Sequence, residues 1–200
     1  MFMDRSSPRG PFETYVVSSE GGSLQRLLPA ENGPHIDANW SPDGRRLVFS
    51  TSDSERNGRE DYGLRILDVA SNKVTPVPGS EGVLSPRWSP DGRYIAGIGK
   101  SGEGLKVLDL ETQRWSVLQK EGLDFPTFSQ DSKFIYFDRW VDGVFRVRVT
   151  GGEAERIADL KGFHQTGSVG VWMGLDPTDT PMLLRDAGTE DIYALTLEEK

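Results

Sequence analysis

The stretch Trp40-Ser41-Pro42-Asp43-Gly44-Arg45 decides the fold, because it returns almost unchanged as Trp88-Ser89-Pro90-Asp91-Gly92-Arg93. A weaker copy is Phe128-Ser129-Gln130-Asp131-Ser132-Lys133, and a degenerate copy is Leu175-Asp176-Pro177-Thr178-Asp179. Repeats of about 40–50 residues, built of short strands and turns, indicate the blades of a β-propeller.

The motif combines turn chemistry with one large aromatic residue. Proline presets φ for the second turn position, aspartate suits the third, and glycine accepts positive φ at the end. We therefore interpret the recurring aspartates as turn-formers. The aromatic residues that open the copies are predicted to pack between neighbouring blades; they are Trp40, Trp88 and Phe128. The departures at 130–132 and 177–179 are expected to weaken the turn and to leave the strand pattern intact.

Short alternating runs bounded by turn residues predict three full blades of four antiparallel strands, over residues 35–79, 83–120 and 124–160. Two partial blades are predicted at the ends, over residues 12–30 and 166–200. The first would have strands at 14–18 and 24–28, and the second at 168–174, 182–185 and 192–197. The fold class is therefore all-β, a β-propeller segment within a single domain or propeller fragment spanning 1–200.

Two arrangements of the partial blades are possible, and they differ in whether the strand edges at the ends of the chain are paired. Residues 24–28 could complete the last blade and close a four-bladed ring. Alternatively the chain is a portion of a larger propeller, and its open blade edges would allow self-association. We favour the portion, because polar residues follow Met1 and strand 14–18 has no role in a closed ring.

The composition narrows the function classes. Hydrophobic residues make up 36% of the 200 residues, enough for a packed fold, and the net charge of −8 disfavours binding to nucleic acid. Cysteine is absent, which excludes disulfides and thiolate sites. No apolar run is long enough for membrane insertion, and the first residues lack the apolar core of a signal peptide. The sequence does not distinguish a cytoplasmic from a periplasmic location.

The repeated Trp-Ser-Pro-Asp-Gly-Arg copies resemble the PD-type, WD-repeat-like repeats of TolB-like β-propellers, over nearly the whole chain. Similar repeats occur in prolyl-oligopeptidase-type peptidases and in the carboxy-terminal parts of bacterial multidomain regulators or kinases. The tail from Trp172 to Leu195 resembles the end of that last group. The resemblance implies a protein-interaction or sensing module and brings no catalytic residues with it.

Catalytic and ligand-binding patterns are weak. Gly167-Ser168-Val169-Gly170 lacks the spacing of a serine nucleophile elbow and is interpreted as the start of an innermost strand. His35 and His164 both precede innermost strands, which would allow a shared metal or acid–base role, although two loop histidines is the favoured interpretation. No glycine-rich phosphate loop is present. We predict no cofactor and no metal.

An acidic cluster offers oxygen ligands of the kind that calcium prefers; its members are Asp53, Glu55, Glu60 and Asp61. The spacing matches no calcium-loop signature, and Arg56 and Arg59 offset the charge. We therefore interpret the cluster as part of a solvated loop.

Propeller geometry brings the connections between second and third strands, and between successive blades, to one face. Function usually resides in loops held on a rigid scaffold. The candidate binding residues on this face are His35, Lys100, Arg139, Trp140, His164 and Arg185. An exposed tryptophan beside an arginine is typical of an interface anchor, although ordinary surface residues is the favoured interpretation. We predict a non-enzymatic module with a protein partner. The alternative is the propeller portion of a prolyl-oligopeptidase-type serine peptidase whose catalytic domain lies outside this chain.

Overall fold

The computed structural model describes residues 1–5, 12–28, 35–53, 61–120, 124–139, 142–164, 172–186 and 188. Over these residues the regular elements are β-strands, apart from the short 3₁₀ helix η2 (Lys100–Gly102). The described part of the chain holds no helix of the length and apolarity that a membrane crossing requires.

Three sheets have four antiparallel strands each, hydrogen-bonded in chain order. The first blade contains β4 (His35–Trp40), β5 (Arg46–Asp53), β6 (Asp61–Asp68) and β7 (Lys73–Pro76). The second contains β8 (Val83–Trp88), β9 (Tyr94–Gly99), β10 (Gly104–Asp109) and β11 (Arg114–Gln119). The third contains β12 (Asp124–Phe128), β13 (Phe134–Arg139), β14 (Gly143–Arg148) and β15 (Glu155–Ala158). These sheets span residues 35–76, 83–119 and 124–158, where the sequence predicts three full blades of four strands.

The end sheets differ more from expectation. The first sheet has three strands where two were predicted: β1 (Phe2–Arg5), β2 (Phe12–Val16) and β3 (Gln25–Arg26). β1 is a strand because it pairs with β2 along its whole length, from Phe2 opposite Tyr15 to Arg5 opposite Phe12. The last sheet pairs β16 (Met173–Leu175) with β17 (Pro181–Leu183). The strand predicted at 192–197 and residues 168–171 lie outside the described residues.

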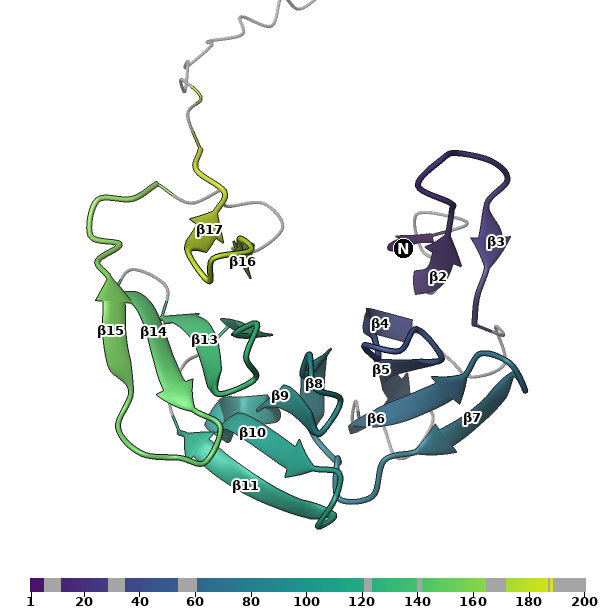
Figure 1. Ribbon diagram of the computed structural model, residues 1–200, viewed down its shortest axis with the longest axis horizontal. Helices are drawn as coiled ribbons and strands as arrows, with labels where there is room; N and C mark the ends of the chain where they lie inside the picture. Colours follow the sequence, from purple (N-terminus) through teal and green to yellow (C-terminus); the bar gives the residue numbers. More distant parts are fainter. Residues whose placement is uncertain are drawn as a thin grey trace, which may run out of the picture.

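The five sheets follow one another around an arc, with β4, β8 and β16 toward its centre and β7, β11 and β15 on its outside (Figure 1). The arc is open between the β1–β2–β3 sheet and the β16–β17 sheet. β3 pairs with β2, so it does not complete the last blade and the described residues do not form a closed four-bladed ring. The fold is an open β-propeller segment.

The core consists of apolar clusters between adjacent sheets. Alternation along β5 shows the principle, because successive side chains of a strand point to opposite faces. Leu47 and Phe49 pack toward the β1–β2–β3 sheet with Leu28, whereas Val48 packs toward the second blade with Trp88. Two further clusters join the second blade to the third through Leu105, Phe128 and Phe137, and the third blade to the last sheet through Tyr136, Val144 and Met173.

An aspartate closes the turn in each of the first three motif copies. The Oδ1 atoms of Asp43, Asp91 and Asp131 accept the hydroxyl of the serine two residues earlier, at 2.5, 2.6 and 2.8 Å. The same atoms accept the amide two residues later, at 3.1, 3.0 and 3.0 Å. In the fourth copy the aspartate stands at the position of the serine, and a threonine stands at the position of the aspartate. There Asp176 accepts the Thr178 hydroxyl and amide, both at 2.7 Å.

The departures from the motif keep the turn geometry. Ser132 and Asp179 have φ of 60° and 63°, compared with 77° for Gly92 at the equivalent position. Each also bonds the preceding blade: the Asp91 amide donates to Ser132 Oγ at 3.0 Å, and the Gln130 amide donates to Asp179 Oδ1 at 2.9 Å. The turn geometry and the strand pattern are therefore retained, and the new side chains join one blade to the next. The expectation that the departures weaken the turn stays a prediction.

Candidate interaction face

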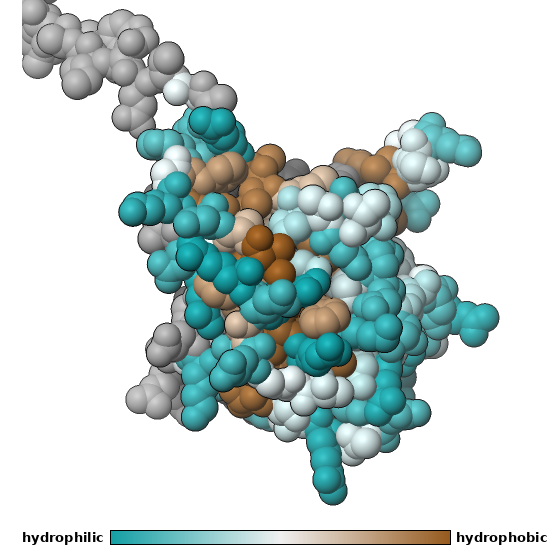
Figure 2. Space-filling model, turned by 60° about the vertical axis from the view of Figure 1, so that its left-hand side comes forward, coloured by the Kyte–Doolittle hydropathy of each residue, from teal (hydrophilic) through white to brown (hydrophobic). Residues whose placement is uncertain are grey.

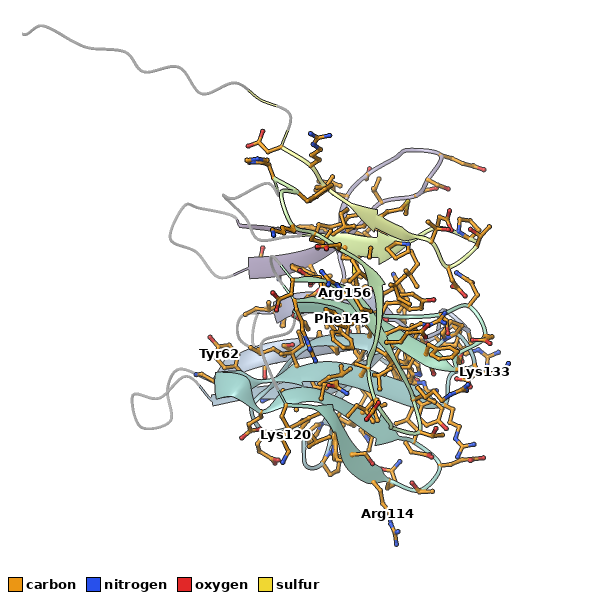
Figure 3. The ribbon with its side chains drawn as sticks, turned by 90° about the vertical axis from the view of Figure 1, so that its left-hand side faces the viewer. Tyr62, Arg114, Lys120, Lys133, Phe145 and Arg156 are labelled. Atoms are coloured by element: carbon orange, nitrogen blue, oxygen red, sulfur yellow. The ribbon has the colours of Figure 1, made fainter. Side chains whose placement is uncertain are left out.

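We call loop face the side of the molecule that carries the β5–β6, β9–β10 and β13–β14 connections and the connections between blades. Figure 3 shows Tyr62 and Lys120 toward this side, at the left of the view, and Lys133 on the opposite side. The turns of the Ser-Pro-Asp-Gly type lie on the same side as Lys133, opposite the loop face. The candidate binding residues can therefore be judged by their position on the loop face.

Lys100 joins the second blade to the first. It follows β9, and its amide donates to the Gly82 carbonyl at 2.7 Å, while the Gly82 amide donates to the Tyr62 carbonyl at 2.6 Å. Its ammonium lies 4.5 Å from the centroid of the Tyr62 ring, within the range of a cation–π interaction. Tyr62 is not among the candidate residues predicted from the sequence. An aromatic residue near the start of a strand could have indicated a platform for a neighbouring cation.

Arg139 makes a second contact between blades. It ends β13, and its Nη2 donates to Gln119 Oε1, at the end of β11, at 3.2 Å. Its guanidinium carbon lies 4.5 Å from the centroid of the Phe145 ring and 5.7 Å from that of Phe137. The neighbouring surface is hollowed by a cavity of about 340 Å³, lined by Val117, Leu118, Gln119, Lys120 and Arg139.

His164 and Arg185 lie together at the last sheet. Both are exposed, and the Asp186 amide donates to the His164 carbonyl at 2.8 Å. This bond brings the backbone of the segment before β16 beside the backbone of the segment after β17.

His35 requires a correction. It is the first residue of β4, paired with Thr51 of β5, and is only 1% exposed, so it is not part of the exposed loop face. Its ring meets the Phe49 ring edge-on at 5.3 Å, and within the described structure neither ring nitrogen has a hydrogen-bond partner. Burial lowers the pKa of His35 to about 4. His35 is buried because the β1–β2–β3 sheet packs over β4, and this packing could not be seen in the sequence.

The remaining candidates are only partly described. Trp140 lies outside the described residues, as do Glu55, Glu60 and residues 167–170. The backbones of Asp53 and Asp61 face each other at the end of the β5–β6 ladder. Where the chain is described, no group of three or more His, Asp or Glu side chains is placed to hold a metal ion.

The sequence is similar to parts of larger proteins, although no family model matches it. It is 30% identical over 128 residues to an uncharacterized peptidase of Bacillus subtilis, YuxL, which covers 64% of this chain and 19% of that protein. It is 33% identical over 86 residues to the Tol-Pal system protein TolB of Francisella tularensis, which covers 42% of this chain and 19% of TolB. The chain therefore spans about a fifth of the length of these relatives.

Solved structures share the fold. TolB from Acinetobacter baumannii superposes with a TM-score of 0.65 at 15% identity, over 89% of this chain and 44% of that chain. Oligogalacturonate lyase from Vibrio parahaemolyticus superposes with a TM-score of 0.54 at 15% identity, over 74% of this chain and 47% of that chain. At such identities the likeness concerns the fold alone, and it shows a β-propeller of the TolB-like kind.

Proposed function

We propose that this TolB-like β-propeller is a non-enzymatic binding module that presents its loop face to a protein partner. The observation that carries the proposal is that two cationic side chains of the loop face are each held in place by a residue of the neighbouring blade. Lys100 is held over Tyr62, and Arg139 is held against Gln119. Fixed cations lose little freedom on binding, and cations beside aromatic rings are typical of interface anchors.

The similarity to known proteins also supports a protein-binding function. One relative is a protein of the Tol-Pal system, and TolB structures share the fold over most of the described chain. A propeller that acts through its loops does not require a catalytic constellation, and the exposure of Arg185 and His164 suits recognition of a partner surface.

Charge reversal on the two faces tests the proposal. Lys100→Glu combined with Arg185→Glu should abolish capture of a partner from a lysate of the source cells. The matched control is Lys73→Glu with Arg114→Glu, because these exposed residues begin β7 and β11 near the opposite face. The captured protein is then purified, and its dissociation constant for each variant is measured by calorimetry. A loss of at least about tenfold is expected for the loop-face pair only. Equal binding by both pairs of variants would contradict the proposal.

A second candidate function is the propeller portion of a prolyl-oligopeptidase-type serine peptidase, favoured by the similarity to YuxL. A hydrolase domain encoded directly downstream of this sequence would support it, and an upstream winged-helix or kinase domain would support the binding module. The chain alone should not turn over peptides or oligogalacturonate. Any turnover that His164→Ala removes would show instead that the chain is itself an enzyme.

A further inference from the structure

We propose that the cavity beside Arg139 binds a carboxylate of the protein partner, from an acidic residue that has an apolar neighbour. The inference rests on the proposed function and specifies the chemistry of one contact within it. We call this cavity the Arg139 hollow; its lining residues are Val117, Leu118, Gln119, Lys120 and Arg139.

The charge of Arg139 is held in place but not neutralised. Its side-chain partners are the neutral Gln119 amide oxygen and the faces of Phe137 and Phe145. These two rings are nearly parallel, 12° apart, and so form a wall against which the planar guanidinium lies. Within the described residues Arg139 makes no ion pair, in contrast to Arg93, which pairs with Asp109 at 2.8 Å.

The buried side of the guanidinium strengthens this argument. Arg139 Nε is shielded from solvent and has no hydrogen-bond partner among the described residues. A cation that has lost part of its hydration without gaining an anion is favourably placed to attract one. The guanidinium fork matches the two oxygens of a carboxylate, which a lysine ammonium does not.

The other lining groups define the ligand further. Lys120 is exposed on the loop face, toward the left of Figure 3, and adds a second positive charge. Val117 is 51% exposed and offers an apolar contact. A volume of about 340 Å³ lies at the lower end of the range for ligand pockets, enough for one or two side chains. The net charge of −8 disfavours an extended polyphosphate, whereas one carboxylate meets the two local cations.

A pair of peptides that differ only in charge tests the site. One is a glycine–serine peptide with a central glutamate–leucine pair, and the other has glutamine in place of the glutamate. Each is titrated into the ¹⁵N-labelled 200-residue chain at low salt, and backbone resonances of Gln119 and Lys120 and the Nε–H resonance of Arg139 are followed. We expect saturable shifts with the glutamate peptide and a dissociation constant at least about tenfold higher for the glutamine peptide.

Variants locate the binding. Arg139→Gln should remove the shifts, and Lys120→Gln should weaken binding by about threefold, because an exposed ion pair contributes little. The matched control is Arg114→Gln, which makes the same charge change at the other end of β11 and should bind as wild type does. Arg139→Gln could perturb the packing against Phe145. Lys120 is exposed, so Lys120→Gln should fold and still tests the site in that case.

Three results would overturn the proposal: equal affinity for both peptides, binding unaffected by both hollow variants, or tighter binding of inorganic phosphate than of the glutamate peptide. The proposed function fails independently of these. If the peptides do not bind but Lys100→Glu with Arg185→Glu still abolishes partner capture, only the carboxylate assignment is removed.

Discussion

His35 shows how one residue can be structural where its type suggests chemistry. It lies among apolar side chains between the first sheet and the first blade, with Phe49 against its ring. The groups that act on it electrostatically are Glu13, which favours its protonated form, and Arg26 and Arg65, which oppose it. Burial outweighs the attraction of Glu13, so the neutral imidazole is the form that the fold accepts.

The first prediction is that His35 makes stability depend on pH. The pKa of His35 is lowered to about 4 in the folded protein, so the unfolded chain binds the proton more readily. The stabilisation is complete above the unfolded pKa near 6.5 and is lost as the pH falls from there toward 4. The resulting loss in the free energy of unfolding amounts to at most about 3.5 kcal/mol.

Denaturant unfolding of wild type, His35→Leu and His164→Leu at pH 7.5, 6, 5 and 4 measures this dependence. His35→Leu should flatten it, and the exposed control His164→Leu should leave it unchanged. Because carboxylates also titrate in this range, the difference between variants is the quantity to compare. Identical curves for all three proteins would show that His35 is solvated in the folded state.

At the scale of elements, local chemistry predicted the strands well. The alternation of apolar residues and the Ser-Pro-Asp-Gly turns predicted three blades of four strands over the residues where the structure has them. Strand β1 was missed because it has only four residues and depends on its pairing with β2. The motif did predict the aromatic contacts between blades, such as those of Trp88 and Phe128. Polar contacts between blades, such as Arg139 with Gln119, were not predicted, since no local pattern records which polar residues of successive blades meet.

The second prediction concerns the bond between the second and third blades. Ser132 Oγ accepts the Asp91 amide at 3.0 Å, and Ser132 itself has a φ of 60° and is buried. Ser132→Ala removes the acceptor and keeps the unfavourable backbone conformation, so it should lower the free energy of unfolding by about 1–3 kcal/mol. Ser132→Gly also removes the acceptor but adopts positive φ without strain, which offsets about 1 kcal/mol of the loss.

Thermal and denaturant unfolding of the two variants distinguish these contributions. Ser132→Gly should be the more stable of the two, although glycine is the more flexible residue. If Ser132→Ala were the more stable variant, position 132 would not be held in the left-handed conformation.

At the scale of the whole molecule, the arc ends in two sheets, each of which has one neighbouring sheet among the described residues (Figure 1). Large apolar side chains are exposed on both: Val17 and Leu24 on the first, and Trp172, Met182 and Leu184 at the last. Figure 2, which brings the side of the last sheet forward, shows hydrophobic residues in brown among hydrophilic residues in teal. Elsewhere on the arc, the equivalent faces are buried in the clusters between blades.

The third prediction is that the 200-residue chain self-associates through these end sheets, because exposed apolar faces and unpaired strand edges favour association. Sedimentation velocity should show species whose size grows with concentration. Met182→Lys with Leu184→Lys should shift the distribution toward monomer. The control Val117→Lys introduces one lysine at a similarly exposed valine on the outer strand of the second blade and should leave the distribution unchanged. A compact monomer at all concentrations would mean that the end sheets are covered within the chain, and that the open arc does not describe the isolated protein in solution.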